Sequence, residues 1–120
     1  MPPIVIADDD ARVLALVGQL VSGAGWTFDT ARDGAEAWQI VQQVIPDLVL
    51  SDINMPGTGG IDLAMKMKQD PRLGRIPLVL MSSADLEAEA NAAGCDAFVA
   101  KPFGLEDLLG TLRRLVPESK

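Results

Sequence analysis

Acidic, hydroxyl and basic side chains follow short apolar runs at several points of the chain. Asp8 and Asp9 come directly after one such run, and Asp52 ends another. Carboxylates that crowd together repel one another unless a cation joins them, and oxygen ligands favour a hard ion such as Mg²⁺. Ser83 and Lys101 follow two further runs, and a hydroxyl and an ammonium beside a metal suit a phosphoryl group that a carboxylate attacks. If these side chains meet, the chemistry indicated is Mg²⁺-dependent phosphoryl transfer onto Asp52.

An alternation of strands and helices would bring those residues together. Apolar runs bounded by turn residues predict strands, and apolar residues that recur every three or four positions predict helices. The predicted strands are 3–7, 26–31, 48–52, 77–81 and 97–100, and the helical patterns between and after them cover 13–24, 37–45, 61–68, 86–93 and 105–116. Asp10 is placed to cap the first helix, and Pro46 is placed to stop the second.

This order predicts a single α/β domain over residues 1–120. Short connections between parallel strands require right-handed crossovers, which place helices on both faces of a parallel sheet. The doubly wound order 2-1-3-4-5 is the common solution for five strands, and it sets the ends of strands one and three side by side. Asp8, Asp9 and Asp52 are therefore expected to converge, with Ser83 and Lys101 closing the pocket.

Composition narrows the classes of function. The chain has 120 residues, a formal net charge of −7 and a pI of about 4.3, which disfavours nucleic acid and anionic membranes as partners because both are polyanions. It contains no histidine, so it cannot supply a phosphohistidine of its own. Cys95 is the only cysteine and the chain shows no signal or membrane-spanning segment, so a cytoplasmic location is expected.

Five short motifs at successive strand ends resemble the receiver domain of bacterial response regulators, the chemotaxis-regulator type of flavodoxin-like fold. The matching residues are Asp8-Asp9, Asp52 with Met55-Pro56 and Gly60, Ser83-Ala84, Phe98 three positions before Lys101, and Lys101-Pro102-Phe103. Each motif alone is weakly specific, but all of them in order, over essentially the whole chain, are a strong signal.

The resemblance implies two-component signalling. Asp52 would accept a phosphoryl group from a sensor histidine kinase, or from a histidine phosphotransfer protein of a phosphorelay. The domain would then change its binding to a partner and catalyse loss of the group, without turning over an external substrate. The resemblance also implies Mg²⁺ held by Asp9, Asp52 and the backbone carbonyl of Asn54, with Asp8 assisting through water.

Further roles follow from the same resemblance. Ser83 would bond the phosphoryl group, Lys101 would pair with it, and Phe98 would change rotamer in response. The peptide bond between Lys101 and Pro102 is expected to be cis.

Two positions bear on the lifetime of a phosphorylated Asp52. Asn54 lies two residues beyond Asp52, and Asp85 lies two residues beyond Ser83. An amide and an acid at these positions can orient an attacking water without blocking it, as in the fast-dephosphorylating chemotaxis type. They predict a short-lived phosphoaspartate.

The fourth helix departs from the family pattern. Lys101 follows Ser83 by 18 positions (101 − 83), which is about one helical turn fewer than is usual in the family. Ala97 and Thr111 stand where dimers of DNA-binding members carry an aspartate and an arginine. These departures predict a monomer, with no symmetric dimer through helix four, strand five and helix five.

Other interpretations stay open at this point. A phosphate-independent interaction module with a degenerate receiver fold is the alternative function, although no pocket residue is missing. A phosphatase of the haloacid-dehalogenase type is disfavoured because it needs a second aspartate where Asn54 stands. Ser82, beside Ser83, leaves the choice of serine open. The sequence also leaves open whether the domain stands alone or belongs to a longer regulator or hybrid kinase.

Overall fold

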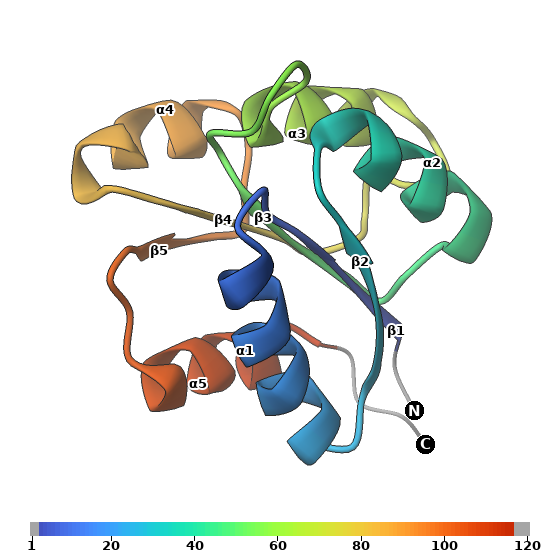
Figure 1. Cartoon of the computed structure of the whole chain (residues 1–120). Coiled ribbons are helices and arrows are strands. Elements are labelled where there is room, and N and C mark those ends of the chain that lie inside the picture. Colours follow the sequence, from blue (N-terminus) through green and yellow to red (C-terminus); the bar gives the residue numbers. More distant parts are fainter. Residues whose placement is uncertain (1–2, 117–120) are drawn as a thin grey trace.

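The computed structural model describes residues 3–116 as one five-stranded parallel sheet between two layers of helices (Figure 1). The strands are β1 (Pro3–Ala7), β2 (Thr27–Ala31), β3 (Leu48–Asp52), β4 (Leu78–Ser82) and β5 (Ala97–Ala100). The helices are α1 (Ala11–Gly23), α2 (Gly34–Val44), α3 (Gly60–Gln69), α4 (Glu87–Ala92) and α5 (Leu105–Leu115). The sheet order is β2-β1-β3-β4-β5, which confirms the predicted topology.

Two hydrophobic cores lie on opposite faces of the sheet. Helices α1 and α5 cover one face, and α2, α3 and α4 cover the other (Figure 1). The inner strands β3 and β4 are buried along their whole length, because helices cover both of their faces. The edge strands β2 and β5 are much more exposed. None of the helices in residues 3–116 is long and apolar enough to span a membrane.

The predicted helix signals are confirmed at the first two helices. The Asp10 side chain caps α1, since its Oδ1 accepts the backbone N–H of Arg12 at 2.9 Å. Helix α2 ends at Val44, and Ile45 takes a left-handed conformation (φ 49°) directly before Pro46. Because Pro46 has no backbone N–H and its ring crowds the preceding turn, the helix cannot continue through it.

Many boundaries differ by one to three residues from the predicted ones, and three of these differences have a clear physical cause. Strand β2 starts at Thr27 because the Trp26 N–H bonds the Val21 carbonyl at the end of α1. Strand β4 starts one residue after Pro77, which has no N–H to donate to the sheet. A 3₁₀ turn over Ala84–Leu86 precedes α4, so the α-helix has only six residues. The prediction of a short fourth helix is therefore confirmed.

Candidate functional site

Three carboxylates meet at the carboxyl end of the sheet. Strands β1 and β3 pair in parallel, with Ala7 opposite Ser51. The next residues in the chain, Asp8 and Asp52, therefore lie side by side. One oxygen each of Asp8, Asp9 and Asp52 lies within 4.8 Å of the others. Asp8 is fully buried and Asp52 is 6% exposed, whereas Asp9 is exposed at the mouth. The predicted convergence of these aspartates is confirmed.

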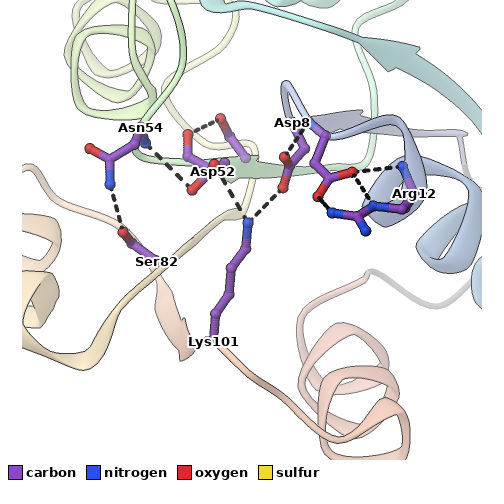
Figure 2. A network of polar contacts seen from close by, with 8 residues as sticks. Asp8, Arg12, Asp52, Asn54, Ser82 and Lys101 are labelled. Carbon is purple, nitrogen blue, oxygen red and sulfur yellow. Dashed lines mark hydrogen bonds and ion pairs between the residues drawn. The ribbon is translucent and has the colours of Figure 1, made fainter.

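Lys101 reaches the same point from the end of β5. Its Nζ lies 2.8 Å from Asp8 Oδ2 and 3.5 Å from Asp52 Oδ2, so the ammonium bridges the two buried acids (Figure 2). The backbone N–H of Lys101 bonds the Ser82 carbonyl at 2.8 Å, which fixes the start of the side chain at the end of β4. The peptide bond between Lys101 and Pro102 is cis, as predicted.

Burial and neighbouring charges shift two pKa values in this cluster. Burial raises the pKa of the Asp52 carboxyl, and the Asp8 carboxylate adds to this effect while Lys101 opposes it. Burial works against the Lys101 ammonium, but the hydrogen bond and the charge of Asp8, together with Asp52, outweigh it and raise the pKa of Lys101. The lysine therefore stays protonated, and a cation that joined the aspartates would favour the ionised form of Asp52.

Asn54 lies near the start of the loop that joins β3 to α3, and it is held at two points. Its backbone N–H donates to Asp52 Oδ1 at 3.4 Å, and its side-chain Nδ2 donates to Ser82 Oγ at 3.1 Å (Figure 2). Farther along the loop, the Thr58 carbonyl accepts the Gly34 N–H at 2.9 Å. These bonds tie the loop to both Asp52 and the start of α2.

The two serines at the end of β4 lie in different surroundings. Ser83 is exposed, and its hydroxyl donates to Asp85 rather than to the acid cluster. Ser82 is 2% exposed and accepts the Asn54 side chain. Sequence reasoning treated Ser82 only as an alternative to Ser83 and missed its contact with Asn54. The sequence feature that could have drawn attention to Ser82 was its position as a polar residue at the end of an otherwise apolar strand.

Phe98 lies in β5 next to β4, with its Cα opposite that of Leu80. Its ring is partly buried and packs against the core beneath α2, α3 and α4. This places the residue predicted to act as a switch in the strand between Lys101 and the short α4.

Comparison with known proteins agrees with this geometry. The family model of the response regulator receiver domain matches residues 4–113. The phosphate regulon transcriptional regulatory protein PhoB of Rhizobium meliloti is 28% identical over 123 residues, which cover 100% of this chain and 54% of that protein. The chain thus spans about half the length of this relative.

Solved structures show the same similarity. The chemotaxis protein CheY4 of Vibrio cholerae has a TM-score of 0.88 at 29% identity, covering 96% of this chain and 98% of that one. The receiver domain of a signal transduction histidine kinase from Syntrophus aciditrophicus has a TM-score of 0.91 at 26% identity, covering 100% and 97%. With the family model matching nearly its whole length and the acid cluster in place, the chain belongs to the response regulator receiver domain family of two-component signalling.

Proposed function

We propose that this receiver domain takes a phosphoryl group onto Asp52 from a phosphohistidine of a sensor kinase or a phosphotransfer protein. The observation that carries the proposal is the bridge from Lys101 to Asp8 and Asp52, inside a cluster of three carboxylates. Burying an acid and an ammonium together costs desolvation free energy that can exceed their mutual attraction, so stability alone does not account for this pair. The same arrangement is suited to a nucleophile and a cation that receive a phosphoryl group.

The donor set of the acid cluster fits Mg²⁺. All side-chain donors in it are carboxylate oxygens, and oxygen ligands are those that Mg²⁺ prefers. Asp9 and Asp52, with the backbone carbonyl of Asn54, would hold the ion, and Asp8 would assist through water. When bound, Mg²⁺ would neutralise charge on the phosphoryl oxygens.

The chain's own residues account for the transfer step. An oxygen of Asp52 forms a bond to phosphorus while the bond from phosphorus to the donor histidine nitrogen breaks, leaving its electron pair on that nitrogen. Lys101 already lies beside Asp52 Oδ2 and would pair with a phosphoryl oxygen. Asp8 holds the lysine in position through the 2.8 Å contact.

A phosphoryl group on Asp52 would also change contacts at β4. To bond that group, the Ser83 hydroxyl has to leave Asp85, to which it donates in this structure. Asp85 lies in the 3₁₀ turn that precedes α4, so loss of this contact would alter that turn. Phe98, which packs against the core beneath α2, α3 and α4, would respond by a rotamer change. The altered surface would be read by the kinase, a phosphotransfer protein or a downstream effector.

An apolar depression beside the site supports a protein as the phosphodonor. It is lined by Val13 and Leu16 of α1 and by Pro102 and Phe103, and it borders Lys101. Leu16 is 45% exposed and adds apolar surface to this depression. A helical partner docked there would bring its histidine close to Asp52.

Mapping of the phosphorylated residue tests the proposal. The protein is incubated with acetyl phosphate, or with a phosphorylated histidine kinase, with and without Mg²⁺. The acyl phosphate is then reduced with borohydride and located by peptide mass spectrometry. We expect one modified aspartate, Asp52, and only when Mg²⁺ is present. Modification of another residue, or no modification with either donor, would overturn the proposal and favour a phosphate-independent interaction module.

We also expect the phosphorylated domain to stay monomeric. Helix α4 has only six residues. Thr111 is uncharged, and its hydroxyl donates to the Asp107 carbonyl of its own helix. Ala97 likewise offers no charge, so a symmetric interface across α4, β5 and α5 lacks both the charge match and the contact area of roughly 1,200 Å² that a stable dimer needs.

The oligomeric state is measured by sedimentation with Mg²⁺ and beryllofluoride, a stable mimic of the phosphoryl group. A single species of monomer mass at micromolar concentration is expected. A dimer that charge reversal at Glu106 or Asp107 dissociates would contradict it.

A further inference from the structure

Arg32, in the connection between β2 and α2, contacts the loop that carries Asp9. Its Nη2 donates to the Asp9 backbone carbonyl at 3.3 Å, although the two residues are 23 positions apart in the chain. The backbone of Arg32 is itself fixed, since its N–H donates to Glu36 Oε1 at 2.7 Å. Ala31, the residue before it, is paired with Ala7 at the end of β2. The guanidinium therefore extends from a well-held backbone, and the proposed phosphoryl transfer gives it no part.

Asp9 is the least restrained acid of the cluster. Asp8 and Asp52 are buried and share the Lys101 ammonium, whereas Asp9 is exposed at the mouth. Within residues 3–116, no hydrogen bond or ion pair holds the Asp9 carboxylate, and the bond from Arg32 reaches the backbone of this residue. The position of the Asp9 carboxylate therefore depends on how its backbone is oriented.

The peptide group that follows Asp9 is bonded on both sides. Its carbonyl accepts from Arg32, and its N–H, which belongs to Asp10, donates to Asp8 Oδ1 at 2.9 Å. Because a trans peptide group is planar, bonds at its two opposite sides restrict its rotation, and with it the direction of the Asp9 side chain. In this orientation one carboxylate oxygen of Asp9 lies within 4.8 Å of oxygens of Asp8 and Asp52. Without the bond from Arg32, only the N–H side would be held.

The charge and the hydrogen bond of Arg32 act in opposite directions on a metal ion. A guanidinium close to a metal site repels a divalent cation, so as a charge alone Arg32 would weaken the binding of Mg²⁺. A residue that holds a metal ligand in place would strengthen binding, because the ligand then loses less conformational freedom when the ion binds. The direction in which the affinity changes when Arg32 is removed therefore separates the two roles.

We propose that Arg32 is a positioning residue that holds Asp9 toward the acid cluster and so raises the affinity of the cluster for Mg²⁺. This inference rests on the proposed function, which assigns Asp9 as a ligand of the ion. It adds a residue from the connection between β2 and α2 that contributes no ligand of its own and acts through the backbone of Asp9.

The affinity of the unphosphorylated protein for Mg²⁺ tests the proposal. MgCl₂ is titrated at constant ionic strength, and the dissociation constant is obtained from backbone amide shifts in NMR spectra. Arg32→Met keeps the length of the side chain and removes its donors, and we expect it to raise the dissociation constant about threefold. The effect is smaller than that of a partner bonded directly to a ligand side chain, because Arg32 is exposed and acts through the backbone. An unchanged or lower dissociation constant would overturn the inference.

Arg75→Met serves as the matched control. Arg75 is an exposed arginine that precedes β4, at the opposite end of the sheet from the acid cluster. The change removes the same charge and the same donors, and the dissociation constant for Mg²⁺ should equal that of the wild-type protein. A loss of affinity as large as that of Arg32→Met would show that the effect does not pass through Asp9, and would contradict the proposal.

A second measurement needs no metal. In NMR spectra recorded in EDTA, Arg32→Met should shift the ¹³C signal of the Asp9 carbonyl and speed hydrogen exchange of the Asp10 N–H, because the peptide group is then held on one side only. Unchanged signals would overturn the contact itself. A wild-type protein that binds no Mg²⁺ would instead overturn the metal site of the proposed function, and this inference with it. Wild-type binding with the same affinity in Arg32→Met would overturn this inference alone.

Discussion

Replacement of Asp52 by asparagine is expected to abolish Mg²⁺-dependent phosphorylation and to make the metal-free protein more stable. The amide cannot act as the nucleophile, so labelling by acetyl phosphate should fall to background. Asp52 is 6% exposed and lies in the same cluster as the buried Asp8, and burial raises its pKa. A raised pKa means that the fold disfavours the ionised carboxylate, so a neutral side chain of the same shape should raise the melting temperature in EDTA.

Mg²⁺ should stabilise the wild-type protein much more than the Asp52→Asn protein. At ten times its dissociation constant, a ligand that binds only the folded state stabilises it by about 1.4 kcal/mol. In the wild-type protein this corresponds to a rise in melting temperature of about 5 °C. Asp52→Asn should lose most of that rise, because one of the three carboxylates is gone.

Asp47→Asn provides the control for this experiment. Asp47 precedes β3 at the opposite end of the same strand, so the change removes one negative charge without touching the acid cluster. Labelling and the Mg²⁺-dependent rise in melting temperature should both be preserved. An Asp52→Asn protein that is still labelled, or that keeps the full rise, would contradict the assignment of Asp52 to this site.

Gly60→Ala is expected to have the second large effect, on folding as well as on phosphorylation. Gly60 is the first residue of α3, and a Cβ atom built there would lie 2.3 Å from the backbone carbonyl oxygen of Asp52. Neither atom belongs to a flexible side chain, so the start of α3 or the end of β3 has to move. Overpacking of this kind costs about 1–3 kcal/mol, and it occurs at Asp52, the residue proposed to accept the phosphoryl group. We therefore expect lower stability in urea together with a reduced rate of labelling.

Gly110→Ala is the matched control for Gly60→Ala. Gly110 lies within α5, and nothing lies within 4 Å of the position where its Cβ would be built. Alanine should therefore stabilise the helix by about 0.5–1 kcal/mol and leave labelling unchanged. The two glycine variants thus change stability in opposite directions. Equal stability of Gly60→Ala and the wild-type protein would show that the contact with Asp52 is not tight.

Much of the fold was predictable because it depends on local patterns. The apolar run Leu48 to Leu50, bounded by turn residues, is typical of a strand buried on both faces, and strict alternation with helices leaves few ways to arrange five such strands. The topology then brings Asp8, Asp9 and Asp52 together, since residues that follow adjacent parallel strands meet at one edge of the sheet. The position of Lys101 could be predicted in the same way.

The hydrogen-bond partners of individual hydroxyl groups could not be predicted from such sequence patterns. Ser82 and Ser83 are adjacent and chemically identical, yet one is buried against Asn54 and the other is exposed and bonded to Asp85. Which side chain each one meets depends on the path of the loop after Asp52 and on the turn before α4, and both are set by packing between elements far apart in the chain.

The sequence by itself therefore determined the order of strands, the family resemblance and the residues of the acid cluster, because strand-end positions carry over directly from chain to sheet. Only the tertiary structure decided the bridge of Lys101 to two acids at 2.8 and 3.5 Å, the approach of Gly60 to the Asp52 carbonyl, and the restraint of Asn54 by Ser82. These contacts depend on side-chain rotamers and on differences of a few tenths of an ångström in atomic position, which no periodicity in the sequence encodes.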